Sequence, residues 1–188
     1  GTFGWDTTTL LIFGLCSSAS AMLGAFVGGR LDDRLGSGTT LRIAVFISTL
    51  LLILLVSIQA DRVLFVIPVS TAPIWDFPYL RSLPELCYFA TNQVFAMFFV
   101  TGLASSRTLM ARLSPPSMAT QFFGLFALSG TLTAFLAPLM VGTVTALFAS
   151  QRAGFASLAT LMAIGFVLLL FVREERATAH NATDSSRL

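Results

Sequence analysis

The chain is 188 residues long, 55% hydrophobic and only 11% charged, with a net charge of +2 and a mean hydropathy of +0.85. Because a water-soluble domain carries about 25% charged residues, this composition excludes an ordinary soluble domain and indicates a surface that faces lipid. The small net charge, with no basic face of interleaved aromatic residues, also excludes nucleic acid as a partner.

Five apolar stretches are long enough to cross a membrane, since a helix needs about 20 residues to span the hydrocarbon core. In chain order they cover residues 9–29, 41–59, 86–104, 119–147 and 154–172. The sequence therefore predicts an all-α polytopic membrane protein, with a transmembrane region over residues 1–172 and a polar tail over residues 173–188.

The long segment between the second and third stretches, residues 60–85, is predicted to be an outer loop. It contains four prolines, which block a continuous helix, and its one apolar run, Val63–Val69, is too short to span. Aromatic side chains can hold part of such a loop on the membrane surface, and here these are Trp75, Phe77 and Tyr79. A re-entrant segment is the alternative interpretation.

The distribution of arginine predicts the orientation in the membrane. Five crossings place Arg62, Arg81 and Arg152 on one side and the other eight arginines on the opposite side. The positive-inside rule makes the arginine-rich side cytoplasmic, so residues 173–188 form a cytoplasmic tail. We expect a multi-pass integral membrane protein, in a bacterial inner membrane or in a eukaryotic organelle such as the vacuole.

Cysteine and histidine give no case for a metal, a cofactor or a disulfide framework. Cys16 and Cys87 lie far apart in or beside apolar runs, as small buried side chains do. His180 stands alone in the polar tail. With no nucleophile, base or metal ligands at membrane depth, we expect no enzymatic activity.

A charged glycine-bounded string follows the first apolar stretch. That stretch carries Gly24 and Gly28, whose spacing of four lets two helices pack closely in lipid. The string Gly29–Gly36 then forms the predicted loop to the second stretch, in which Arg30 and Arg34 flank Asp32 and Asp33. A tight turn in which such charges pair is one interpretation, and an ordinary polar hairpin is the other.

Polar residues in the third and fourth stretches are candidates for a solute path. Asn92 and Gln93 lie in the outer half of the third stretch, where hydrogen bonding between helices explains them equally well. The fourth stretch carries Ser129 and Thr131. Apart from Glu85 at a border, no Asp, Glu, His or Arg lies well inside the five stretches, so we expect the carboxylate of any proton coupling to lie elsewhere.

The fourth stretch also predicts a bend. Pro138 removes one backbone hydrogen bond of the helix, and Gly142 follows one turn later. Bent helices often line the path of a transporter, and a kinked packing helix is the equal alternative.

The string Gly-x-Leu-x-Asp-Arg-x-Gly at Gly29–Gly36 resembles the signature loop of the major facilitator superfamily. The chain is most similar to the branch of autophagy-related vacuolar amino-acid effluxers and their bacterial relatives. Further residues that carry this resemblance are Ser106–Leu109, Ala111–Leu113, Pro115, Phe122–Phe126, Ser129–Gly130, Pro138 and Gly142. Two family features are absent, since Ser37 and Gly38 replace two basic residues and Gln121 replaces an acidic one.

The resemblance implies the C-terminal half of a secondary transporter, in which the five helices belong to a six-helix half. It implies that Gly29, Asp33, Arg34 and Gly36 form a conformational switch. It also implies that a small solute, such as an amino acid, moves by alternating access between this half and a missing N-terminal half. The alternative is a membrane scaffold or assembly subunit that transports nothing.

Overall fold

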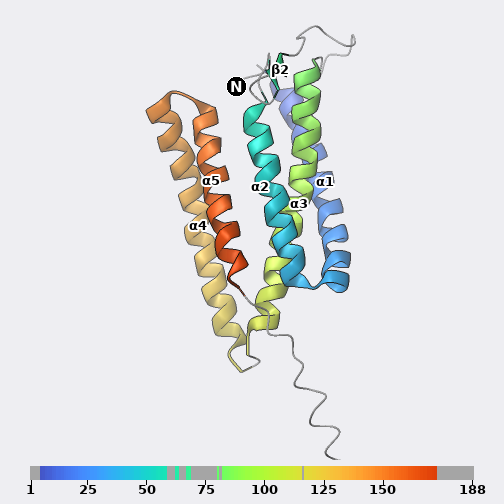
Figure 1. Ribbon diagram of the computed structural model, residues 1–188, viewed down its shortest axis with the longest axis vertical. Coiled ribbons are helices and arrows are strands. Elements are labelled where there is room, and N and C mark those ends of the chain that lie inside the picture. Colours follow the sequence, from blue (N-terminus) through green and yellow to red (C-terminus); the bar gives the residue numbers. More distant parts are fainter. Residues whose placement is uncertain are drawn as a thin grey trace, which may run out of the picture.

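The computed structural model describes residues 5–58, 62–63, 67–68, 80, 82–115 and 117–172. Five long helices make up nearly all of this part of the chain (Figure 1): α1 Thr7–Leu35, α2 Ser37–Ser57, α3 Leu83–Leu113, α4 Ala119–Phe148 and α5 Gln151–Leu170. Two short strands, β1 Arg62–Val63 and β2 Ile67–Pro68, pair antiparallel with Val63 opposite Ile67. Each helix is long and apolar enough to cross a membrane. The prediction of an all-α polytopic membrane protein is thereby confirmed.

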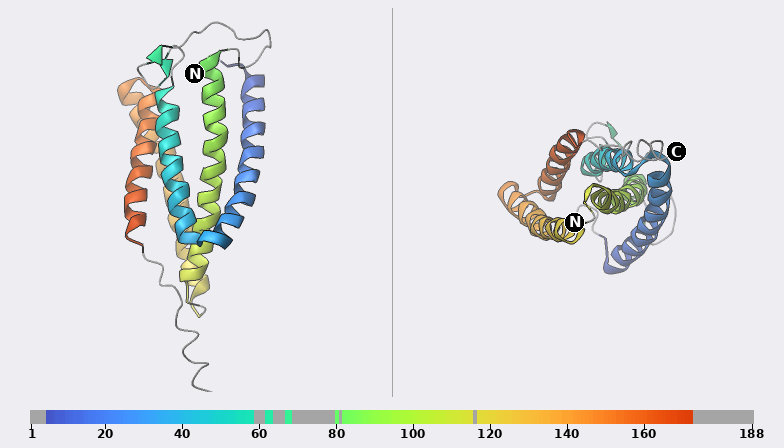
Figure 2. Two further views of the ribbon diagram at one scale, coloured as in Figure 1. Left: turned by 45° about the vertical axis from the view of Figure 1, so that its right-hand side comes forward. Right: turned by 90° about the horizontal axis from the view of Figure 1, so that it is seen from below.

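The helices run alternately up and down the bundle. The α1–α2 turn and the α3–α4 connection lie at one end, and the start of α1 and the α4–α5 turn lie at the other (Figure 1). Viewed along the bundle, α2 and α3 lie between α1 on one side and the α4–α5 pair on the other (Figure 2). Helix α3 packs against α1 and α2, while α5 packs against α2 and α4.

Small and polar side chains fill the interior, and large apolar side chains cover the outside. Helix α2 is central and buries, among others, Ser37, Thr40, Ala44 and Ser48. Lipid gives helices no hydrophobic reason to associate, so close packing through small residues takes over that role. Exposed apolar side chains, such as those of Leu15, Met22, Phe135 and Leu147, then face lipid or further protein. In α4, no residue at all is buried.

Helix α1 is longer than predicted. We expected a loop over Gly29–Gly36, but the helix continues through Leu35 and only Gly36 separates it from α2. Nothing in Arg30–Leu35 breaks a helix, since charged side chains are tolerated in a last turn. Gly36 ends the helix because its φ of 87° is a conformation that favours glycine.

Helix α3 also extends past its predicted end at residue 104. It begins behind Ser82, whose backbone N–H donates to Glu85 over 3.0 Å, and it ends at Leu113. Pro115 explains this end, because the residue before a proline avoids helical geometry and Ser114 is extended with ψ of 125°. The extension adds Ser105 and Leu109 to the buried surface of α3.

Two further expectations meet the structure only in part. Helix α4 stays continuous across Pro138, so the bend there remains a prediction. Most of the loop 60–85, including Trp75, Phe77 and Tyr79, and the tail 173–188 lie outside the described residues.

Candidate functional site at the interface of α1 and α3

Helices α1 and α3 run parallel, and mostly polar and small residues line their contact from Ser17 to Asp32. From α1 the contact residues are Ser17, Ser20, Gly24, Gly28 and Asp32, and from α3 they are Asn92, Gln93, Met97, Thr101 and Ser105. Spacings of three or four residues, with Asn92 directly before Gln93, keep each set on one face of its helix. We call this set the α1–α3 interface.

The outer part of the interface is a cluster of hydrogen bonds. The Asn92 Nδ2 amide donates to the Ser17 hydroxyl over 2.9 Å, and the Gln93 Nε2 amide approaches the same oxygen at 3.4 Å. The Ser20 hydroxyl donates to Gln93 Oε1 over 3.0 Å. Asn92 and Gln93, predicted as candidates for the solute path, therefore lie where the alternative interpretation put them, in bonds between helices.

In the middle of the interface, the two backbones touch. A Cβ atom added to Gly24 would stand 2.2 Å from the Met97 carbonyl oxygen, and one added to Gly28 would stand 2.9 Å from Thr101 Cγ2. The Thr101 hydroxyl donates to the Gly24 carbonyl over 2.8 Å. By contrast, Gly29 has no atom within 4 Å of such a Cβ. Gly28, rather than Gly29, is thus the glycine that the contact requires.

At the inner end of the interface lies a buried carboxylate. The Ser105 hydroxyl donates to Asp32 Oδ1 over 2.7 Å, and the two residues are 0% and 7% exposed. Asp33 and Arg34, the charges of the predicted switch, are exposed. The expected pairing of these neighbouring charges does not occur among the described residues, because successive helical residues point about 100° apart. The role of Asp33 and Arg34 remains a prediction.

Further polar groups gather at this end of the bundle. Ser37 and Thr40, in the first turn of α2, are fully buried, and their hydroxyls have no hydrogen-bond partner in the described part of the chain. Arg42, one turn later, donates through Nη2 to the Val172 carbonyl beyond the end of α5. A cation at the C-terminal end of a helix is electrostatically favourable. Arg42 thereby ties α2 to the end of α5.

The remaining predicted site residues lie on α4, away from this interface. Ser129 and Thr131 are exposed, and their hydroxyls donate to carbonyls of their own helix, Phe126 and Ala127. Gly142 has open space beside it. The structure therefore brings Asn92 and Gln93 together on α3 and leaves Ser129 and Thr131 on a different helix with no buried residue.

The outer ends of α1 and α3 are joined around Trp5 and Glu85. The Trp5 indole donates to Glu85 Oε1 over 3.0 Å, and its ring lies 5.3 Å from that of Phe13 and 5.9 Å from that of Tyr88. Asp6 caps α1, and hydrogen bonds from the Thr9 hydroxyl and backbone N–H hold the pKa of its carboxyl below the ordinary 3.8. These contacts hold Trp5 and the start of α1 against α3.

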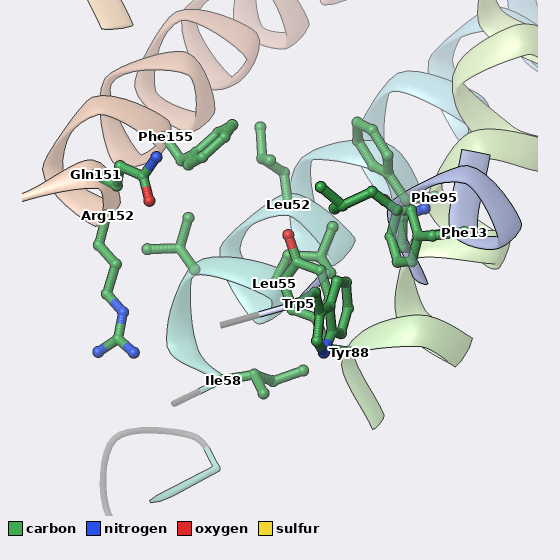
Figure 3. A pocket seen from close by; sticks show the side chains of 13 residues that line it. Trp5, Phe13, Leu52, Leu55, Ile58, Tyr88, Phe95, Gln151, Arg152 and Phe155 are labelled. Atoms are coloured by element: carbon green, nitrogen blue, oxygen red, sulfur yellow. The ribbon is translucent and has the colours of Figure 1, made fainter. Parts of the chain in front are cut away.

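A cavity of about 360 Å³ lies beside this outer junction (Figure 3). Its walls come from the residues before and in α1, the end of α2, the start of α3 and the start of α5. Most of its lining is apolar or aromatic, and Asn92, Gln151 and Arg152 add polar groups. A cavity of this size is within the range that holds small ligands.

The described residues offer no metal centre, since no three His, Cys, Asp or Glu side chains cluster among them. Cys16 and Cys87 are free cysteines. His180 lies outside the described part.

Thr101 and Ser105 are functional candidates that our sequence analysis did not identify, and Asp32 was predicted only as a charge in the loop. A signal was present, because Gly24, Gly28 and Asp32 repeat every four residues, as do Met97, Thr101 and Ser105. Small or polar residues at this spacing mark a packing face in a membrane helix. We ended both predicted helices too early, so Asp32 and Ser105 fell outside them.

Comparison with known proteins relates the chain to one family of membrane transporters. The chain matches the family described as "Vacuole effluxer Atg22 like" over residues 1–182. It is 35% identical over 75 residues to an uncharacterized MFS-type transporter of Bacillus subtilis, YxiO. This alignment covers 40% of this chain and 18% of that protein. It is also 33% identical over 112 residues to autophagy-related protein 22 of Cryptococcus neoformans. This second alignment covers 58% of this chain and 19% of that protein.

These alignments cover about a fifth of the length of the curated relatives that the chain matches. No solved structure matches the chain.

Proposed function

The chain belongs to the vacuole effluxer Atg22-like family of transporters. We therefore propose that it forms the C-terminal half of a secondary transporter, which moves a small solute by alternating access. Amino acids are the proposed solute class, on the strength of the family resemblance. Asn92, Gln93, Ser129 and Thr131 remain the candidates for the solute path.

The observation that carries this proposal is the buried hydrogen bond between Asp32 and Ser105, 2.7 Å long, at one end of the α1–α3 interface. A hydrogen bond to a charged group contributes about 1.5–3 kcal/mol. Making or breaking it would change a balance between two conformations by more than about tenfold. We propose that this bond holds the inner ends of α1 and α3 together in one of the two states.

The middle of the interface holds α1 and α3 closely together. Gly24 and Gly28 bring α1 onto Met97 and Thr101, and the Thr101 hydroxyl donates to the Gly24 carbonyl there. Further polar bonds lie toward the two ends, through Asn92 outside and Asp32 inside. In this proposal, α1 and α3 stay in contact at the middle of the interface, and the bonds at its two ends form and break during transport.

A second half of the transporter is part of the proposal. Helix α4 has no buried residue, although it carries Gly124, Gly130 and Gly142 with open space beside each. Small residues are typical of faces against which another membrane helix packs. The solute would then bind between this bundle and the partner half.

Uptake into reconstituted vesicles tests the proposal. We expect the complete transporter that contains this chain to give saturable uptake of at least one radiolabelled amino acid. Vesicles with the chain alone should match a lipid control, since one half cannot enclose a site. Saturable uptake by the chain alone would disprove the need for a partner half. A correctly inserted complete protein that transports no small solute would favour the alternative, a membrane scaffold.

A further inference from the structure

We propose that the 360 Å³ cavity at the outer end of the bundle binds an anionic amphiphile, with its acyl chain among the apolar walls and its charged head at Arg152. The shared chemistry is one negatively charged group on a hydrocarbon chain, as in an anionic phospholipid or a free long-chain carboxylate. This site is separate from the proposed contact between Asp32 and Ser105, which lies at the opposite end of the α1–α3 interface.

The walls of the cavity are suited to a hydrocarbon chain. Aliphatic and aromatic side chains from four different parts of the bundle make up most of its lining: Leu10, Phe13, Leu52, Leu55, Val56, Ile58, Phe95 and Phe155. Against such walls an acyl chain stays in apolar surroundings, whereas exposing it to water would cost about 25 cal/mol for each Å². A hydrophilic solute would gain nothing from them.

The charge carried by the described residues that line the cavity is positive. Arg152 is the one charged side chain among them, and the Glu85 carboxylate beside the cavity accepts a hydrogen bond from Trp5. Figure 3 shows Arg152 on one side of the cavity, with Trp5, Tyr88 and Phe13 on the opposite side. An occupant that satisfies both sides must carry a negative group at one end and an apolar body at the other.

The depth of the cavity in the membrane favours an amphiphile over a wholly apolar or a wholly soluble molecule. Several of its lining residues stand at helix ends, since Trp5 precedes α1, Ile58 follows α2, and Arg152 is the second residue of α5. Trp and Tyr are enriched where the headgroups of a bilayer meet its hydrocarbon core. Trp5 and Tyr88 therefore mark the level at which a lipid changes from charged to apolar.

Quenching of Trp5 fluorescence tests the proposal directly. The chain has two tryptophans, so Trp75→Phe leaves Trp5 as the reporter inside the cavity. This variant is titrated in mixed micelles with lipids brominated on the acyl chain, which quench a tryptophan on contact. Phosphatidylglycerol supplies an anionic head and phosphatidylcholine a zwitterionic one, and a brominated long-chain carboxylate tests the free amphiphile.

We expect half-quenching at an about fivefold lower mole fraction of an anionic probe than of phosphatidylcholine, as one arginine near a headgroup contributes. Arg152→Gln should remove this preference. Arg107→Gln, which removes an exposed arginine at the opposite end of the bundle, should retain it. Val56→Phe places a larger side chain in the cavity wall and should weaken quenching by all probes. Circular dichroism verifies that each variant is helical.

The anionic arms identify the source of the occupant. Preference for phosphatidylglycerol alone assigns the site to membrane lipid, and preference for the carboxylate alone assigns it to a free amphiphile. Equal quenching by anionic and zwitterionic probes, or a preference that survives Arg152→Gln in a folded protein, would overturn the proposal.

Discussion

The Ser105 hydroxyl donates a hydrogen bond to the Asp32 carboxylate over 2.7 Å, and both residues are buried between α1 and α3. This pair makes the inner end of the α1–α3 interface polar, whereas its middle is formed by glycines against a backbone. A bond to a buried carboxylate is costly to leave unmade. The pair should therefore affect both stability and the conformational balance.

Removal of the donor from this pair should destabilise the bundle. We expect Ser105→Ala to lower the free energy of unfolding by about 1–3 kcal/mol, because it leaves a buried carboxylate without its partner. Ser106→Ala is the matched control, since that hydroxyl donates only to the Leu103 carbonyl of its own helix. Thermal unfolding in detergent, followed by circular dichroism, measures both. Equal effects of the two changes would mean that the Asp32–Ser105 bond contributes nothing.

A side chain at Gly24 should force α1 and α3 apart. We expect Gly24→Ala to destabilise the protein by about 1–3 kcal/mol, the usual cost of an overpacked contact, because its Cβ would stand 2.2 Å from the Met97 carbonyl oxygen. Gly14→Ala in the same helix meets open space, and should be neutral or stabilise by up to about 1 kcal/mol. Thermal unfolding in detergent measures the stability of both variants. A Gly24→Ala protein as stable as the parent would disprove this contact.

The turn between α4 and α5 contains a backbone conformation that a glycine would adopt at lower cost. Ala149 lies in the left-handed region, with φ of 49° and ψ of 30°. This conformation costs a residue with a Cβ about 1–2 kcal/mol. We therefore expect Ala149→Gly to stabilise the protein by about 1 kcal/mol. Ala146→Gly, inside the same helix, should instead destabilise it by about 1 kcal/mol, and a loss of stability at both positions would contradict the turn geometry.

Labelling of single cysteines tests the predicted orientation of the helices in the membrane. In a background of Cys16→Ser and Cys87→Ser, single cysteines at Arg34 and Arg112 should react with an impermeant maleimide from the cytoplasmic side. A cysteine at Ala149 should react from the opposite side, because α4 separates it from the cytoplasmic end (Figure 1). The arginine distribution sets this orientation. Labelling of positions 34 and 149 from the same side would contradict it.

The fold could be predicted from the sequence because each spanning helix is a long apolar run, and lipid permits little else than a helix for such a run. Helix ends were harder to predict. Polar residues such as Asp32 and Ser105 mark the end of the apolar run, yet they do not end the helix. Only Gly36 and Pro115 do so, through their backbone geometry.

The candidate site was predicted less well than the fold. A resemblance aligns the string Gly29–Gly36 by residue type, but which carboxylate points inward depends on helical rotation. Asp32 and Asp33 differ by one residue, so they face directions about 100° apart. The contacts of Asn92 and Gln93 with Ser17 required the register of α1 against α3, which a single sequence does not give.

In our proposal, Asp32 is the carboxylate whose hydrogen bond to Ser105 of α3 controls the conformational balance. The resemblance assigns such a role to Asp33, which is exposed, so the two substitutions Asp32→Asn and Asp33→Asn form a matched pair. Each removes one charge and keeps the shape of the side chain. A neutral acceptor at position 32 weakens the bond from Ser105 by about 1 kcal/mol.

The decisive measurement is the initial rate of solute transport by the complete transporter, divided by the amount of protein in the membrane. We predict that Asp32→Asn changes this rate about fivefold, whereas Asp33→Asn leaves it within about twofold, as exposed substitutions usually do. A normal rate for Asp32→Asn together with a large change for Asp33→Asn would contradict the account and restore the switch to the exposed residue.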